Sequence, residues 1–321
     1  MMQSNQQIKM LIEQLNEVVI GQEHVVKAMV IALLTDGHVL LEGLPGTAKT
    51  RAVKSLSSAL GLAFSRIQFT PDMLPSDITG SQSFDKHSGD LVFQAGPIFN
   101  CMVLADEINR APAKVQAALL EAMAEGTVSA GGESMVLPEP FMVLATQNPV
   151  EQEGTYPLPE AQMDRFLMKV DVDYPDVDAE KAIIRLVREE ALNTRLQMNT
   201  ERSPLTLNAS MISEAKASVR KIHVSEAVEQ YIADLVVATR TKGVCSDWIE
   251  VGASPRASIA LDKCARAHAW LEGRDYVTPD DVRLVAMPVL GHRVMLSYEA
   301  ISGGVTQRDA VQRLLCDVHL T

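Results

Sequence analysis

Residues 43–50 combine glycines with a Lys-Thr pair, which are the residue types that hold nucleotide phosphates. After the apolar run 38–42 come Gly43, Leu44, Pro45, Gly46, Thr47, Ala48, Lys49 and Thr50. In such a loop, consecutive backbone N–H groups bind phosphate oxygens, and the N-terminus of the next helix adds positive potential. Lys49 would contact the β and γ phosphates, and the Thr50 hydroxyl would bind Mg²⁺. Ala48 replaces the usual glycine, which a negative φ at a helix start allows; the alternative is a strand-to-helix turn with an incidental lysine.

Two adjacent acids end a second apolar run, at 101–106. Asp106 is suited to coordinate Mg²⁺ through water, and Glu107 can polarise a water that attacks the γ-phosphate. A further run, 141–146, is followed by Gln147 and Asn148, and Asn148 is the better candidate to hold that water against Glu107. The alternatives are a strand end that begins a polar loop, for the acids, and an Asn-Pro turn, for Asn148.

The elements that must position these residues follow from hydrophobic patterning. Apolar runs predict buried strands of an α/β fold at 38–42, 64–69, 101–106, 141–146 and 167–171. Runs this apolar fit a sheet that is covered on both faces. Turn residues between short apolar ends predict two β-hairpins, at 81–93 and 127–137, which either contact partners or decorate the surface. After residue 176 the strand signals stop, and helical patterns continue to the C-terminus.

Composition limits the class of protein. The length of 321 residues suggests about two domains, and 47% hydrophobic with 22% charged residues is ordinary for a globular chain. The net charge of -12 disfavours a broad nucleic-acid footprint. Four cysteines without a CxxC pair, no signal peptide and no apolar run of membrane-spanning length predict a cytoplasmic protein.

The motifs occur in the order of one family, and together they cover essentially the whole chain. The sequence resembles MoxR-type AAA+ ATPases. Segment 43–50 is similar to that family's P-loop, 106–111 to its Walker B segment, 145–149 to its sensor 1, 160–166 to its arginine-finger segment and 252–257 to its sensor 2. Val19 and Ile20 resemble the linker beside the adenine in AAA+ proteins.

The resemblance implies an α/β AAA+ P-loop core with a five-stranded parallel sheet of order 5-1-4-3-2, two inserted β-hairpins and a C-terminal all-helical lid. We place the nucleotide-binding core, with its N-terminal helix, at 1–172 and the linker and lid at 173–321. The resemblance also implies Mg²⁺-dependent ATP hydrolysis in a homo-oligomeric ring, usually a hexamer, with ATP at each subunit junction. The ring would remodel or mature a client protein or complex, commonly with a partner that carries a von Willebrand factor A domain.

Two arginines can be weighed on physical grounds as well. Ser254 and Pro255 predict a helix start, which puts Arg256 in a first turn where a cation is disfavoured by roughly 0.3–1 kcal/mol. Contact with a phosphate would offset that cost, so Arg256 is a candidate sensor 2; the alternative is a solvated surface arginine. Arg165 is either an ion-pair partner of Asp164 or Asp171 or, as the resemblance implies, a finger that reaches the neighbouring subunit's γ-phosphate. Arg110 is a further candidate for an intersubunit contact.

Three other functions remain open from the sequence. A nucleic-acid motor needs basic pore hairpins, but 127–137 has no Lys or Arg, and 81–93 has one Lys against two Asp. A nucleotide-gated scaffold with little turnover is disfavoured by the presence of Glu107, Asn148 and Arg165. A metal-chelatase motor subunit is a related machine that the motifs do not exclude.

Overall fold

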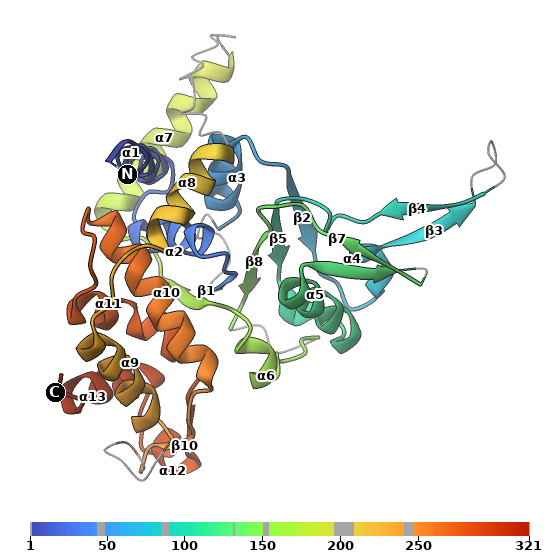
Figure 1. The fold of residues 1–321 in the computed structure, drawn as a ribbon. Coiled ribbons are helices and arrows are strands. Elements are labelled where there is room, and N and C mark those ends of the chain that lie inside the picture. Colours follow the sequence, from blue (N-terminus) through green and yellow to red (C-terminus); the bar gives the residue numbers. More distant parts are fainter. Residues whose placement is uncertain are drawn as a thin grey trace.

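The computed structural model describes residues 2–43, 49–84, 90–130, 132–149, 154–195, 209–240, 245 and 247–320. A central sheet with helices on both faces carries two projecting hairpins, and a group of helices lies beside it (Figure 1). In the described part of the chain, no helix combines the length and hydrophobicity that a membrane span needs.

The central sheet has five parallel strands in the order β2-β5-β8-β1-β9. They are β1 (Val39–Gly43), β2 (Phe64–Gln68), β5 (Met102–Asp106), β8 (Met142–Gln147) and β9 (Met168–Val172). Numbered by chain order among themselves, these strands give the predicted order 5-1-4-3-2. The expected boundaries are correct to within one residue at each end. Because all strands run in parallel, their carboxyl ends meet at one edge of the sheet.

Alternate residues of the strands enter two different hydrophobic clusters. Val39 and Leu41 of β1 pack in a cluster with α1 (Met2–Val18), α2 (Glu23–Leu34) and α3 (Lys49–Leu60). Leu40, between them, packs in the opposite cluster with α5 (Ala113–Glu125). This alternation is what a period of two residues requires when both faces are covered, and it explains why the strands are continuous apolar runs.

Both predicted hairpins are present. After α4 (Pro75–Thr79), β3 (Gly80–Phe84) pairs with β4 (Leu91–Ala95), and later β6 (Thr127–Ala130) pairs with β7 (Glu133–Val136). The β3–β4 hairpin projects well away from the sheet (Figure 1) and exposes the apolar side chains of Phe84 and Leu91. The expected turn residues at 87–89 and at 131 lie outside the described residues.

The second half of the chain is predominantly helical, as predicted. Its helices are α7 (Val177–Arg195), α8 (Ala209–Val219), α9 (Glu226–Ala238), α10 (Pro255–Leu271), α11 (Pro279–Leu290), α12 (Tyr298–Ser302) and α13 (Gln307–Asp317). Ser254 and Thr278 cap α10 and α11, each followed by proline at the first helical position. One short antiparallel ribbon, β10 (Ile249–Val251) with β11 (Met295–Leu296), was not expected. Two- and three-residue strands carry too little alternation to register in a sequence pattern.

The lid helices are not separated from the sheet by a polar gap. Apolar side chains of α9, α10 and α11 belong to the same buried cluster as those of α1, α2 and one face of the sheet. Helix α10 is central to this packing, because it contacts α2, α8, α9 and α11. The lid therefore rests on the helical layer beside β1 and β9.

His38, immediately before β1, is a buried polar residue with a defined protonation state. The Val143 N–H donates to its Nδ1 at 3.0 Å, and its Nε2 lies 3.1 Å from the Met123 carbonyl oxygen. An imidazole that accepts at Nδ1 and donates from Nε2 is neutral. Burial lowers the pKa of His38 from 6.5 to about 4.

We predict that His38 makes the fold sensitive to acid. Because its pKa is lower in the folded chain, the folded state loses stability as pH falls from about 6.5 towards 4, and a shift of this size corresponds to about 3 kcal/mol. His38→Gln is expected to lower the free energy of unfolding at pH 7.5 and to flatten its decline between pH 6.5 and 4.5. Denaturant unfolding at several pH values measures both. An unchanged pH dependence in the variant would show that His38 is not responsible.

Candidate active site

The phosphate-loop elements converge at the carboxyl edge of the sheet. Gly43 ends β1, and a Cβ atom on it would come within 2.4 Å of the Val172 carbonyl oxygen of β9, so only glycine fits. Leu44, Pro45, Gly46, Thr47 and Ala48 of the predicted phosphate-binding loop lie outside the described residues. Helix α3 begins at Lys49, with Thr50 half-buried in its first turn. A strand therefore precedes these residues and a helix follows them, which is the context that a P-loop needs.

Lys49 lies within the electrostatic field of the acidic residues. Its Nζ donates a hydrogen bond of 2.5 Å to the Gly43 carbonyl oxygen. Burial lowers the pKa of Lys49, and the carboxylates of Asp106, Glu107 and Glu42 counteract part of that shift. A partly buried cation among carboxylates at the start of a helix is well placed to exchange its present partners for phosphate oxygens.

Asp106, the last residue of β5, is bound from both neighbouring strands. Its Oδ1 accepts a hydrogen bond of 2.6 Å from the Thr146 hydroxyl of β8, and its Oδ2 accepts one of 2.6 Å from Arg66 of β2. Thr146 in turn accepts a hydrogen bond of 2.9 Å from the Glu107 N–H. The Thr146 hydroxyl therefore connects the two acidic residues.

Glu107 has an unusual backbone for a residue with a side chain. Its φ is +58°, in the left-handed region, which costs of order 1 kcal/mol or more and is typical of functional sites. Its Oε2 accepts a hydrogen bond of 2.9 Å from Gln68 and lies 3.2 Å from Nε of Arg110. In this state Glu107 is held by its own subunit, and Arg110, predicted as an intersubunit contact, is its ion-pair partner.

Asn148 follows β8 directly and is buried at the same edge. Its backbone carbonyl oxygen accepts a long hydrogen bond of 3.4 Å from the side chain of Asn109, which lies between Glu107 and Arg110 in sequence. Asn148 thus lies at the end of β8, the strand beside the one that ends in Asp106, as the sequence analysis expected.

Arg66, Gln68 and Thr146 are the site residues that sequence analysis missed. Arg66 and Gln68 belong to no nucleotide-binding pattern, and Thr146 lies in the segment similar to sensor 1 but was given no role of its own there. Each is recognisable as a site residue only once the strand order is known. The available signal was weak: Arg66 and Gln68 are polar residues near the end of a predicted strand, and Thr146 stands beside the Gln147-Asn148 pair.

Thr50 and Asp106 carry the oxygen atoms that could hold Mg²⁺. The described residues contain no group of three or more His, Cys, Asp or Glu side chains that could enclose a metal ion. Mg²⁺ suits such a sparse site, because it is usually bound by one or two protein oxygens together with waters and substrate phosphates. A hydroxyl in the first turn of α3 and a carboxylate at the end of β5 fit that chemistry.

Val19 and Ile20 lie at the predicted adenine side, between α1 and α2. Val19 is buried, and a Cβ atom on the adjacent Gly21 would come within 2.9 Å of Ala179 in α7. The side chain of Gln22 donates a hydrogen bond of 2.8 Å to the Asp173 carbonyl oxygen just after β9. The segment between α1 and α2 therefore packs against the residues that follow β9 and lead to α7.

Arg165 and Arg256 are placed together, but not with Lys49. Both line a cavity of about 240 Å³ between α10, the end of α5 and the residues just before β1 and β9, and neither Lys49 nor Glu107 is among its described lining residues. Arg165 donates from NH1 to the Leu120 carbonyl oxygen of α5 at 2.5 Å. Its proposed ion-pair partners, Asp164 and Asp171, are instead bound by Arg293 and Arg308. The Arg256 side chain is 53% exposed.

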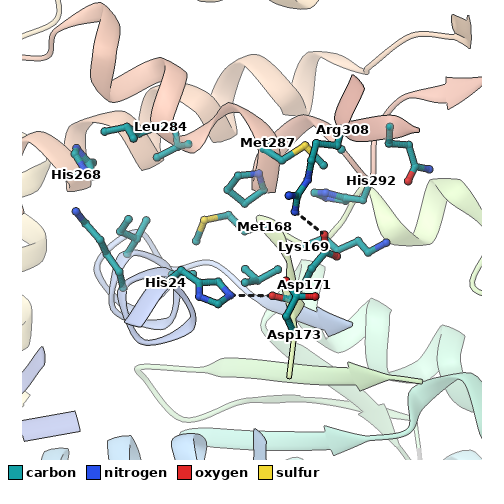
Figure 2. A pocket seen from close by; sticks show the side chains of 18 residues that line it. His24, Met168, Lys169, Asp171, Asp173, His268, Leu284, Met287, His292 and Arg308 are labelled. Atoms are coloured by element: carbon teal, nitrogen blue, oxygen red, sulfur yellow. Dashed lines mark hydrogen bonds and ion pairs between the residues drawn. The ribbon is translucent and has the colours of Figure 1, made fainter. Parts of the chain in front are cut away.

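A larger cavity of about 540 Å³ lies between α2, the edge strand β9 and α11 (Figure 2). Its cationic side chains already have acidic partners. Lys27 pairs with Glu272, Lys169 with Glu42, and Arg308 with Asp171, whose backbone carbonyl oxygen also contacts His24 at 2.9 Å. The cavity follows the edge of the sheet and its described lining contains no phosphate-loop residue, so it is separate from the candidate active site.

Comparisons with known proteins agree with this arrangement. Residues 38–168 match the ATPase family associated with various cellular activities (AAA), and residues 242–314 match the AAA lid domain. The chain is 41% identical to the chaperone MoxR1 of Mycobacterium tuberculosis, over 96% of this chain and 80% of that protein. It is 35% identical to protein MoxR of Paracoccus denitrificans, over 88% of this chain and 87% of that one.

A solved structure from Cytophaga hutchinsonii has a TM-score of 0.91 and 42% identity, and it covers 100% of this chain and 96% of its own. The family models, the identity to these relatives and the likeness to the solved structure agree with the five-stranded parallel sheet and the helical second half of the chain. The chain belongs to the MoxR-type AAA+ ATPases.

Proposed function

We propose that the chain hydrolyses ATP by direct attack of water at the carboxyl edge of the sheet. The observation that carries this proposal is the convergence of Lys49, Asp106, Glu107 and Thr146 from three different elements. Lys49 binds the β and γ phosphates, and the residues of 43–48 other than Pro45 supply backbone N–H groups. Thr50 and Asp106 would hold Mg²⁺, which neutralises phosphate charge when it is bound.

Glu107 acts as the general base in this proposal. Its carboxylate must first exchange its bonds to Gln68 and Arg110 for one to the attacking water. Asn148, at the end of the adjacent strand, orients that water. Thr146 holds the Glu107 backbone and the Asp106 carboxylate together, so the base and the metal ligand keep a fixed separation.

We further propose that each site is completed by a neighbouring subunit. Arg165 and Arg256 line one cavity, and Lys49 is not among its described lining residues. Both arginines would therefore act on the ATP of a neighbouring subunit in a homo-oligomeric ring, a hexamer in our proposal, with ATP at the junctions. Residues 1–172 would serve as nucleotide-binding core and 173–321 as lid, with Val19 and Ile20 at the adenine. Hydrolysis would remodel or mature a client protein, together with a partner that carries a von Willebrand factor A domain.

The proposal places the ring in the cytoplasm. All four cysteines are free thiols, and burial raises the pKa of the Cys264 thiol to about 12, so this residue is a packing element. Free cysteines suit a reducing compartment.

Replacement of the general base separates ATP binding from hydrolysis. Glu107→Gln is expected to bind ATP with unchanged affinity and to turn over at least ~100-fold more slowly, because amides are poor bases. Lys49→Ala is expected to lose most ATP affinity, because the phosphates lose their main cation. Nucleotide titration and steady-state turnover measure the two effects. Normal turnover in Glu107→Gln would remove it from the mechanism.

Thr146→Val tests the hydroxyl that joins the acids. Valine has nearly the same shape but cannot bond to Asp106 or to the Glu107 N–H, so we expect turnover to fall by about tenfold or more and stability by about 1–3 kcal/mol. Thr35→Val is the matched control, because Thr35 is also buried and bonds to the Ile31 carbonyl oxygen in α2. The control should lose some stability and keep its turnover. Equal turnover in both variants would contradict the role of Thr146.

Mixing two inactive variants tests the shared site. Arg165→Ala should bind ATP but not hydrolyse it, since a finger acts on transition-state charge. Lys49→Ala should fail at binding but still present an intact finger. When subunits exchange, some junctions combine an intact P-loop with an intact finger, and partial activity should return. If exchange is demonstrated and activity stays absent, Arg165 acts within its own subunit or supports the fold.

A further inference from the structure

Arg293, just after α11, is a buried arginine whose five N–H donors are all used. Its Nε donates to Asp164 Oδ1 at 2.9 Å. Its NH1 donates to the carbonyl oxygens of Leu167 at 3.1 Å and Val289 at 2.6 Å. Its NH2 donates to those of Asp164 at 3.3 Å and Phe166 at 2.5 Å. The side chain is 3% exposed, and all five of these bonds are made within the chain.

Four of these five bonds reach one short segment, the residues on either side of Arg165. His292 adds a contact of 3.2 Å from its Nε2 to the Phe166 carbonyl oxygen. The segment between α6 (Glu160–Met163) and β9 is therefore bound to the lid through its backbone as well as through the Asp164 carboxylate.

Asp164 also reaches the start of α10, which carries Arg256. Its Oδ2 accepts a hydrogen bond of 2.8 Å from the Ser254 hydroxyl, and it lies 3.9 Å from NH1 of Arg256. Ser254 is the cap of α10 and accepts from the Arg256 N–H at 3.2 Å. Asp164, which precedes Arg165 in sequence, thus bonds through one carboxylate both to Arg293 and to Ser254, the cap of the helix that carries Arg256.

We propose that Asp164 and Arg293 are positioning residues that hold Arg165 and Arg256 in one fixed relative placement. This inference rests on the proposed function, in which both arginines act on a neighbouring subunit's ATP. The finger segment and the lid then move as one body, and lid rotation carries both arginines to or from the junction together. Preorganisation of this kind matters because displacement of a charged group by about 1 Å can cost 10²-fold in rate.

The competing explanation is that Asp164 and Arg293 only stabilise the fold, since removal of one partner of a buried Arg–Asp pair strongly destabilises a protein. The two explanations differ in which half of the shared site they affect. Loss of positioning damages only the arginines that a subunit presents to its neighbour. Loss of stability also damages the subunit's own P-loop.

The experiment uses Asp164→Asn and Arg293→Lys in the full chain. Asparagine keeps the shape and an acceptor but loses the charge, and lysine keeps the charge but cannot make five directed bonds. Each variant is expected to lose kcat by about 10- to 100-fold, while its ATP dissociation constant changes by less than about threefold. Full turnover in both variants would overturn the inference.

Mixing locates the defect. Asp164→Asn mixed with Lys49→Ala should regain activity, because the first supplies an intact P-loop and the second an intact finger with its supports. Asp164→Asn mixed with Arg165→Ala should not, because both lack the same half. Absence of recovery in the first mixture, with subunit exchange demonstrated, would mean that Asp164 only supports its own subunit, and would overturn the inference.

Arg274→Gln is the matched control. Arg274 bonds to the buried Asp281 at 2.6 Å through both NH1 and NH2, within the lid and without contact to the finger segment. Arg274→Gln should lower the unfolding midpoint about as much as the Asp164 and Arg293 variants do, and it should leave kcat within about twofold.

The mixture of Arg165→Ala with Lys49→Ala distinguishes failure of the proposed shared site from failure of the positioning role. If it fails, the shared site is wrong; if it recovers while the Asp164 and Arg293 variants behave like Arg274→Gln, only the positioning role is wrong.

Discussion

The carboxylate of Asp106 is the charge on which the arrangement of the candidate active site depends. One oxygen accepts from Thr146 and the other from Arg66, and the same charge favours the protonated form of Lys49 across the sheet edge. Three strands and one helix start are connected in this way. The Thr146 hydroxyl extends the connection to the Glu107 backbone, whose left-handed conformation turns the chain away from β5.

These contacts depend on the strand order. Because β5 lies between β2 and β8, the end of β5 is flanked by Arg66 and Gln68 on one side and by Thr146 on the other. Gln68 and Arg110 occupy the carboxylate of Glu107 in the isolated chain. The Glu107 carboxylate is thus bonded to protein groups, and in the proposed mechanism the attacking water has to compete with them for it.

The lid is attached by two kinds of interaction. Apolar packing against α1 and α2 is broad and non-directional, and would tolerate small shifts of the helices. The bonds from Arg293 and Ser254 to the segment around Arg165 are directional, and they determine one position. The first kind keeps the lid on the core, and the second relates two particular arginines to one another.

The sequence by itself determined the elements and most of the site. Apolar runs located all five strands of the central sheet to within a residue, since burial on both faces leaves little choice of residue type. The helix starts at Ser254 and Thr278 are local as well, because cap and proline act within one turn. Lys49, Asp106, Glu107 and Asn148 could be proposed from the sequence because each ends or follows a predicted strand in a nucleotide-binding pattern.

The tertiary structure alone decided which side chains meet. Arg66 and Asp106 are 40 residues apart, and Asp164 and Arg293 are 129 apart. No periodicity spans such distances, and a polar residue at a strand end looks the same whether it faces water or a carboxylate. Partners of this kind are set by the order of the strands and the docking of the lid, because hydrogen bonds require specific atoms within about 3 Å, whereas hydrophobic patterning requires only a buried face.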